Sequence, residues 1–155
     1  MIDIKSIGDL VFRLNYWRSY GDRIVLTWGV FDLFHHGHNN YIKSAFSAGD
    51  RLVIFLDSDE KALFRKGVGR PIDEFATRAQ NILRTGCVDL VVEFPLNATN
   101  LTVLEMVRPD ILVVSNESGE AFGDRQYTLP FPLEIRVIQR TEGISTTQIL
   151  NATKE

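Results

Sequence analysis

The amino-acid sequence predicts an α/β fold: a doubly wound, Rossmann-like parallel sheet of about five strands. Short apolar runs alternate with segments whose apolar residues recur at helical spacing, and this alternation continues along almost the whole chain. The runs are apolar at nearly every position, as expected of strands that are buried on both faces. Such strands need helices on each side of the sheet, so the sequence predicts three layers, α/β/α.

The first third of the chain predicts a helix, a strand and a second helix. Residues 6–19 repeat apolar side chains at helical spacing, and Ser6 can cap their start. Residues 24–28 are a short apolar run that ends at Gly29, which indicates a buried strand. Residues 39–48 are predicted to form the next helix.

The middle third predicts two further strands and the helix between them. Residues 51–56 are a second continuous apolar run, and residues 88–94 are a third. Residues 73–85 place their apolar side chains on one helical face, and Gly86 ends this helix. Residues 59–71 are mixed and basic, and no helix or strand is assigned to them.

The last third predicts a short helix over residues 100–108 and strands over 110–114 and 133–138. A final helix is predicted to start at Ser145, where Gln148 would complete a capping box. These elements complete the alternation of strands and helices.

Length and composition indicate one soluble domain. The 155 residues predict a single domain over 1–155, with a helical extension at 1–22 and the core at 23–152. The net charge of −3 argues against nucleic acid or an anionic membrane as the main partner, so positive charge for an anionic ligand must be local. The chain has no apolar run of ~18 residues, no signal-peptide layout and a lone Cys87. We therefore expect a cytoplasmic protein without membrane insertion.

The loop after the first predicted strand, with His35-His36-Gly37-His38, carries the densest chemistry. Gly29 lets a ligand approach the backbone, and Gly37 opens a helix whose free N–H groups favour an anion. Each imidazole can donate a hydrogen bond to a phosphate oxygen. Three interpretations follow: helix capping, a metal site that includes Asp32, and phosphate-binding catalysis. The sequence has no cysteine cluster, which disfavours zinc, and it leaves capping and catalysis equally open.

Two segments resemble motifs of the cytidylyltransferase-like family. Thr27 to His38 is similar to its nucleotide-binding motif, Gly-x-Phe-Asp-x-x-His-x-Gly-His. Arg140 to Thr147 resembles its C-terminal signature and is most like that of glycerol-3-phosphate cytidylyltransferases. The two motifs occur in the expected order, about a hundred residues apart, and together are more specific than either alone. The resemblance covers residues 24–152 and implies a nucleotidyltransferase.

The first motif implies roles for the histidines and the aspartate of the loop. His35 and His38 would contact the triphosphate and stabilise charge on the α-phosphate as catalytic residues. Asp32 would help to position the nucleotide and any Mg²⁺, as a candidate metal ligand. The other nucleotide-binding positions that this motif implies are Gly29, Val30, Phe31 and Gly37.

The second motif implies a clamp for the outer phosphates. Arg140 would supply charge to the reaction, while Ser145, Thr146 and Thr147 would bind the nucleotide, and hydroxyls with an arginine suit a phosphate. After the strand at 110–114 many relatives carry Gly-Asp, whereas this chain has Ser115-Asn116. Asn116 offers a donor and an acceptor to a base, but the resemblance carries no base preference across this difference.

The middle segment is similar in spacing to heptose-phosphate adenylyltransferases. In that resemblance Lys66 would reach the phosphates as a catalytic residue, and Arg78 would face the site and bind the acceptor phosphate. From the residues alone, each is equally well a surface or ion-paired side chain.

The combined resemblance predicts transfer of CMP from CTP to a small, glycerol-3-phosphate-like phosphomonoester, with release of pyrophosphate. Mg²⁺ is the expected cofactor and a homodimer the expected assembly. The first alternative is an adenylyltransferase that acts on a sugar phosphate with ATP. The second is an inactive nucleotide-binding sensor or scaffold. The sequence has no Gly-x-x-x-x-Gly-Lys-Ser/Thr motif, which disfavours a P-loop kinase.

Overall fold

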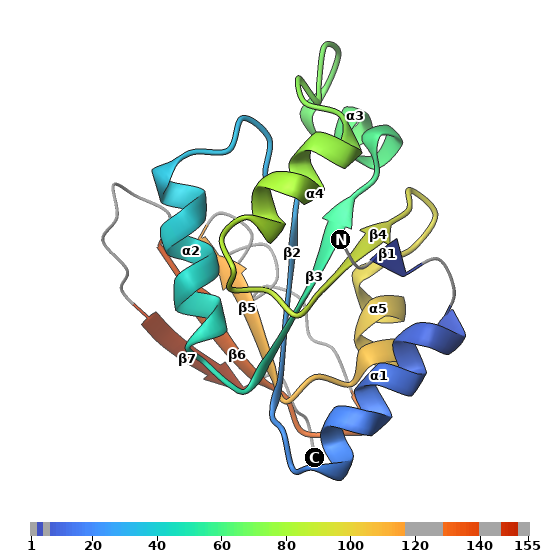
Figure 1. Ribbon diagram of the computed structural model, residues 1–155, viewed down its shortest axis with the longest axis vertical. Coiled ribbons are helices and arrows are strands. Elements are labelled where there is room, and N and C mark those ends of the chain that lie inside the picture. Colours follow the sequence, from blue (N-terminus) through green and yellow to red (C-terminus); the bar gives the residue numbers. More distant parts are fainter. Residues whose placement is uncertain (1–2, 5–6, 117–128, 140–146, 152–155) are drawn as a thin grey trace.

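One sheet organises the computed structural model, which describes residues 3–4, 7–116, 129–139 and 147–151 (Figure 1). The strands are β1 (Asp3–Ile4), β2 (Ile24–Gly29), β3 (Arg51–Asp57), β4 (Leu90–Phe94), β5 (Ile111–Ser115), β6 (Glu134–Ile138) and β7 (Thr147–Asn151). The helices are α1 (Ile7–Ser19), α2 (His36–Phe46), α3 (Asp59–Lys66), α4 (Phe75–Leu83) and α5 (Asn100–Val107). The strand order is β1-β4-β3-β2-β5-β6-β7.

The predicted Rossmann-like sheet is confirmed. The five strands β2 to β6 are parallel, the short β1 extends one edge in parallel, and β7 extends the other edge antiparallel. The chain moves from β2 outward to β3 and β4, then returns to the opposite side of β2 for β5 and β6. The order therefore reverses between β2 and β5, and ligands of such sheets bind outside the carboxyl ends of the strands at this point.

Two apolar layers cover the sheet, as the three-layer prediction requires. In β2, Leu26 belongs to the layer with α1 and α5, whereas its neighbour Val25 belongs to the layer with α2 and α4. Figure 1 shows these helix pairs on different sides of the strands. Both layers contain residues with no exposed surface, so the strands are apolar along their whole length because both faces are buried.

The N-terminal helix α1 packs on the core. Leu10, Leu14 and Trp17 are buried in the same layer as α5. Arg18 also donates hydrogen bonds to the carbonyls of Val107 and Arg108 at the end of α5. The apolar face of α1 is thus used within the chain, and the homodimer and the domain boundaries remain predictions. Within the described ranges, no helix has both the length and the apolar character needed to cross a membrane.

Two helical boundaries differ from the sequence prediction in a way that shapes the site. The basic segment after β3 begins with α3, which Ser58 caps through the amide of Lys61. Acidic residues in the first turn of α3 and basic residues in the last turn complement the helix dipole. Helix α2 starts at His36, three residues before the predicted start, because His35 is its N-cap.

The prediction of a final helix from Ser145 is wrong for the part that the structure describes. Residues 147–151 form β7, which pairs antiparallel with β6 from Ile138↔Thr147 to Glu134↔Asn151. A parallel β6 at the edge would leave a row of unpaired backbone groups, and β7 satisfies them. This tertiary demand outweighs the local capping pattern.

Candidate active site

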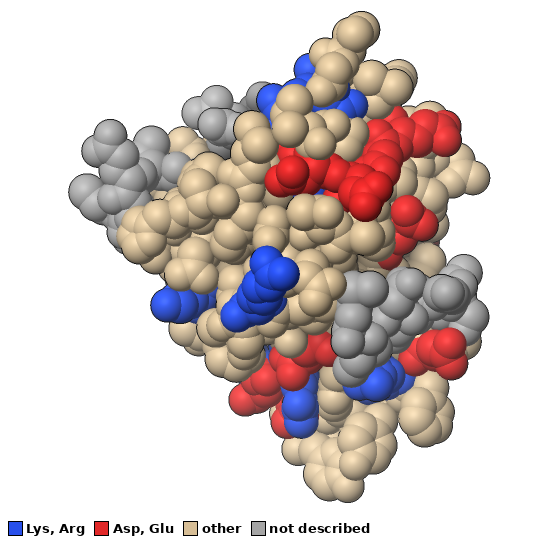
Figure 2. All heavy atoms as spheres, turned by 45° about the horizontal axis from the view of Figure 1, so that its top comes forward, with Lys and Arg blue, Asp and Glu red and all other residues tan. Residues whose placement is uncertain are grey.

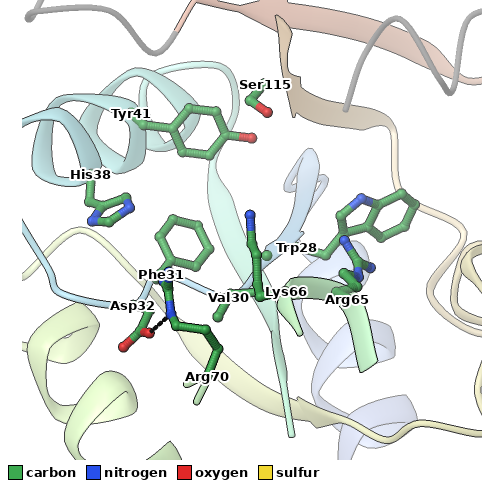
Figure 3. Close-up of a pocket in the computed structure, with 11 residues that line it drawn as sticks. Trp28, Val30, Phe31, Asp32, His38, Tyr41, Arg65, Lys66, Arg70 and Ser115 are labelled. Atoms are coloured by element: carbon green, nitrogen blue, oxygen red, sulfur yellow. Dashed lines mark hydrogen bonds and ion pairs between the residues drawn. The ribbon is translucent and has the colours of Figure 1, made fainter. Parts of the chain in front are cut away.

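A pocket opens at the carboxyl end of the sheet, next to the reversal in strand order (Figure 3). Strands β2 and β5, helices α2 and α3, and the loops after β2 and α3 all contribute to its walls. The residues that line it are Trp28, Gly29, Val30, Phe31, Asp32, His38, Tyr41, Arg65, Lys66, Arg70 and Ser115. The pocket therefore lies where the fold predicts a ligand.

The two predicted catalytic histidines cap α2. The amide of Gly37 donates to His35 Nδ1 at 3.0 Å, and the amide of His35 donates to His38 Nδ1 at 3.2 Å. The two rings stack with their centroids 3.9 Å apart. His35 is exposed, whereas His38 is only 4% exposed and lines the pocket. The capping interpretation is thus correct, and it does not compete with catalysis.

Capping fixes the chemistry that the imidazoles can offer. A ring nitrogen that accepts a hydrogen bond carries no proton, so in the neutral ring the proton is on Nε2. In both His35 and His38 the accepting atom is Nδ1, so each neutral ring is a donor at Nε2. Donors at fixed positions suit an anion such as a phosphate.

The glycines of the loop are required by close packing. A Cβ atom on Gly37 would lie 2.8 Å from Cε1 of His35, so a side chain there would displace the capping imidazole. A Cβ atom on Gly29 would lie 3.0 Å from the ring of Phe31, which folds back over the end of β2. Phe31 has a φ of 51° and Leu33 a φ of 50°, which are uncommon for residues with side chains. Strain of this kind is typical of functional loops.

Asp32 holds this loop to the segment before α4. Its Oδ1 accepts from the amides of Leu33 and Asp73, and its Oδ2 accepts from the amide of Ile72 and from Nε of Arg70, all within 3.0 Å. Burial raises the pKa of Asp32, but the two amides from the other segment and Arg70 outweigh it and hold the pKa below its ordinary value. Its four acceptor positions are filled, so metal binding by Asp32 would require these bonds to break.

Arg78 does not lie where the sequence predicts. Its side chain is completely buried and lies outside the pocket lining. It donates to the carbonyls of Val30, Asp57 and Asp73 and to the carboxylate of Asp59 at 2.6–3.0 Å. Arg78 therefore joins the loop after β2, the end of β3 and the start of α4. Binding of an acceptor phosphate would require this network to open.

The basic side chains of the pocket belong to α3 and to the loop that follows it. Arg65, the predicted Lys66 and Arg70 all line the pocket. Figure 2 shows basic side chains gathered near the top of the view beside an acidic area, although the chain as a whole is acidic. The local positive charge that a phosphate ligand needs is thus present in the pocket.

The structure brings together most residues of the first motif and says less about the second. Arg140, Ser145 and Thr146 lie outside the described residues, and of Thr147 only the backbone position in β7 is described. Asn116 directly follows β5, and its neighbour Ser115 lines the pocket. Within the described ranges, no cluster of three His, Cys, Asp or Glu residues could hold a metal ion.

The sequence analysis missed several residues that line the pocket, among them Trp28, Tyr41 and Arg70. The hydroxyl of Tyr41 hydrogen-bonds Thr27 Oγ1 at 2.7 Å and donates to the carbonyl of Val113 at 3.3 Å, so it connects α2 to β2 and β5 at the reversal. Its position three residues after His38, on the same helical face, was the available signal.

Comparisons with known proteins match most of the chain. A family model described as cytidylyltransferase-like matches residues 26–152. Bifunctional protein HldE of Pseudomonas aeruginosa (strain LESB58) is 35% identical over 153 residues, which are 98% of this chain and 32% of that protein. Bifunctional protein HldE of Alcanivorax borkumensis is 33% identical over 153 residues, which are again 98% of this chain and 32% of that protein. The chain thus spans about a third of the length of these relatives.

Solved structures give the same architecture. A lipopolysaccharide core biosynthesis protein from Thermoplasma volcanium GSS1 matches with a TM-score of 0.56 and 26% identity, over 69% of this chain and 80% of that one. A pantoate-beta-alanine ligase from Francisella tularensis matches with a TM-score of 0.59 over 94% of this chain and 70% of that one. At 14% identity the second match supports the fold alone.

Proposed function

The chain belongs to the cytidylyltransferase-like family and is a nucleotidyltransferase, and from this premise we propose that it transfers AMP from ATP to a sugar phosphate. The observation that carries the choice of substrates is the similarity to HldE proteins, which extends over 98% of the chain and includes the middle segment. That segment is similar in spacing to heptose-phosphate adenylyltransferases. A lipopolysaccharide core is built from sugars, so the structural similarity to a lipopolysaccharide core biosynthesis protein is consistent with a sugar substrate.

This proposal reverses the order of the two sequence-based alternatives. The expectation of CTP and a glycerol-3-phosphate-like acceptor depended on the short C-terminal motif from Arg140 to Thr147. The similarity to HldE covers far more of the chain than that motif. Transfer of CMP from CTP therefore becomes the second candidate, supported by that motif.

In the proposed reaction an oxygen of the acceptor phosphate attacks the α-phosphorus of ATP. The bond from that phosphorus to the bridging oxygen breaks, pyrophosphate leaves with the electron pair, and a sugar linked to ADP forms. Such a transfer depends on positioning and on charge stabilisation. His38 lines the pocket and donates from Nε2 in its neutral form, which suits an α-phosphate oxygen, while Lys66 suits the phosphates on the opposite wall.

Mg²⁺ enters this proposal with the triphosphate. The described residues hold no preformed acidic cage, and Asp32 has all its acceptor positions filled. Mg²⁺ is often held mainly by substrate phosphates and water, with few protein ligands. We therefore assign the ion to the nucleotide substrate and derive no catalytic step from a protein-bound metal.

A pyrophosphate-release screen tests the proposal. Wild-type protein is incubated with Mg²⁺ and ATP, CTP, UTP or GTP against sugar phosphates, glycerol 3-phosphate and phosphocholine. We expect release with ATP and a sugar phosphate, and formation of the nucleotide sugar in the same reaction. Turnover with CTP and glycerol 3-phosphate alone would overturn the proposal. Binding of a triphosphate without turnover of any acceptor would favour the sensor.

A further inference from the structure

A second buried carboxylate lies at the end of β3, and no role has been assigned to it. Asp57 is the last residue of β3 and has no exposed surface. Neither of its carboxylate oxygens has a hydrogen bond in the part of the chain that the structure describes. Buried polar groups are nearly always hydrogen-bonded, because an unpaired one costs free energy. An exception at the carboxyl end of a strand, where ligands of such sheets bind, therefore calls for an explanation.

The charge of Asp57 is balanced by cations on α3. Arg65 Nε lies 3.2 Å from Asp57 Oδ2, as an ion pair. Lys61 contributes a second attraction, but its Nζ donates to the carbonyl of Ala98 and lies over the ring of Phe94. Burial raises the pKa of the Asp57 carboxyl, while attraction to Arg65 and Lys61 lowers it, and burial prevails. The main effect of the carboxylate on the pocket is thus exerted through Arg65.

Arg65 connects this buried charge to the pocket. It is the next-to-last residue of α3, and its side chain is 33% exposed. Figure 3 shows Arg65 on the Trp28 side of the pocket, across from His38. The contact with Asp57 uses Nε, and the two terminal nitrogens make no hydrogen bond with the residues that the structure describes. A guanidinium held in this way can present both terminal nitrogens to a phosphate.

The topology indicates which phosphate this is. The nucleotide is expected at the reversal between β2 and β5, where His38, Tyr41 and Ser115 lie. Arg65 belongs to α3, which follows β3. Strand β3 lies on the other side of β2 from β5. In an in-line reaction the acceptor approaches the α-phosphorus from the side opposite to the leaving pyrophosphate. The β3 side of the pocket is therefore available to the acceptor.

We propose that Arg65 binds the phosphate of the acceptor phosphomonoester and that Asp57 is the residue that positions it. This inference rests on the proposed function for the identity of the reaction, and it moves the acceptor-binding role from Arg78 to Arg65. Arg70, which also lines the pocket, is already paired with Asp32. Lys66 is a point charge, whereas Arg65 offers the planar fork that matches a phosphate.

Binding of inorganic phosphate tests the inference directly. The full chain is first saturated with the α,β-methylene analogue of the triphosphate that binds most tightly, and phosphate is then titrated by calorimetry. We expect Arg65→Met to weaken phosphate binding by about tenfold or more and to change the affinity for the analogue by less than about twofold. Arg84→Met is the matched control, because Arg84 is an exposed arginine that donates to Asn81 on α4. This control should bind both ligands as the wild type does.

The role of Asp57 is tested by a double-mutant cycle. Asp57→Asn should weaken phosphate binding less than Arg65→Met does, and the double variant should bind no more weakly than Arg65→Met alone. In turnover, both single variants should raise KM for the acceptor and leave KM for the triphosphate unchanged. A purely structural contribution of Asp57 would lower kcat and affect both substrates. If the Asp57 variant does not fold, Arg65→Gln still tests the inference, because it removes the charge of Arg65 at an exposed position.

Three results would overturn the inference: a wild type that binds no phosphate, an Arg65→Met variant that binds it normally, or one that loses the triphosphate analogue equally. The identity of the nucleotide is decided separately by the pyrophosphate-release screen. If that screen selects CTP while Arg65→Met loses phosphate, the proposed function fails and the acceptor site stands. If it selects ATP while Arg65→Met behaves as wild type, the acceptor site fails and the proposed function stands.

Discussion

Two walls of the pocket each have an arginine that is paired with a buried aspartate, and the two pairs are built differently. Asp32, on the loop after β2, accepts hydrogen bonds from three amides and from Arg70. Asp57, at the end of the neighbouring strand β3, faces Arg65 without a hydrogen bond among the described residues. Protein donors thus satisfy one carboxylate fully and leave the other dependent on a single ion pair.

This difference indicates that the two aspartate–arginine pairs have different functions. The bonds of Asp32 hold the loop and the segment before α4 in one arrangement, so that Arg70 is committed to the protein. Asp57 instead keeps a partly exposed arginine at the pocket, where its remaining donors can meet a ligand. The opposite pKa directions of the two carboxyls, lowered for Asp32 and raised for Asp57, reflect the same contrast.

The largest effect is expected at Arg78, which connects the two walls. Arg78→Met should lower the free energy of unfolding by about 3–5 kcal/mol, because three carbonyls lose the donor that this buried side chain supplies and the half-exposed Asp59 loses its ion pair. Urea denaturation followed by circular dichroism measures this change. The control Arg84→Met, directly after the end of the same helix, should change the free energy of unfolding by less than about 0.5 kcal/mol. If Arg78→Met is as stable as the wild type and has a raised KM for the acceptor, the result would support binding of the acceptor phosphate by Arg78.

The next effect concerns His38, on the well-satisfied wall. His38→Ala should lower kcat by about 100-fold or more if its Nε2–H stabilises charge on the α-phosphate. It should also cost about 1 kcal/mol of stability, because the amide of His35 loses its acceptor.

His38→Gln separates these two contributions. Glutamine at the third position of a helix can accept the capping bond, so this variant should keep its stability and still lose activity. Comparison of kcat and of thermal melting for the two variants makes the distinction. If His38→Gln turns over nearly as fast as the wild type, His38 has no catalytic role and serves only to cap α2.

The architecture could be predicted from the sequence because it depends on patterns that are local along the chain. The strands were recognisable because continuous apolar runs such as 51–56 are diagnostic of burial on both faces. The histidine loop was recognisable because Thr27 to His38 resembles a family motif, whereas its residues alone left helix capping and catalysis equally open. The final helix was wrong because the free edge of β6, which the sequence does not display, decided the structure of residues 147–151.

The charged residues of the site could not be assigned in the same way. Arg65, Lys66 and Arg70 lie in the basic segment 59–71, and Arg78 follows in the next predicted helix. The structure buries Arg78 completely, whereas the other three line the pocket and Arg70 is paired there with Asp32. These outcomes depend on which carbonyls and carboxylates the fold brings within reach, and composition and spacing do not encode that information.

The third prediction tests the satisfied carboxylate. Asp32→Asn should lower the free energy of unfolding by about 1–3 kcal/mol, because its amide nitrogen would face donors that now bind an oxygen. The pKa of Asp32 is lowered in the folded protein, so the ionised group stabilises the fold above its ordinary pKa of 3.8, and this stabilisation is lost as the pH falls through the lowered value. The difference in the free energy of unfolding between the wild type and Asp32→Asn should therefore become smaller at acidic pH. Urea unfolding over a range of pH measures it, and a gap that is independent of pH would contradict the assignment.

The smallest effect, with the opposite pH dependence, is expected at Asp57. Its pKa is raised in the folded protein, so folding favours the protonated carboxyl, and the ionised group lowers stability at neutral pH. Asp57→Asn should thus be as stable as the wild type at neutral pH or more stable, within about 1 kcal/mol. As the pH falls through the raised pKa the wild type gains a proton and the advantage of the variant should disappear. Unfolding of both variants in the same buffers compares the two walls directly. If Asp57→Asn loses as much stability as Asp32→Asn at neutral pH, the ion pair with Arg65 serves the fold, and the difference between the walls has no functional meaning.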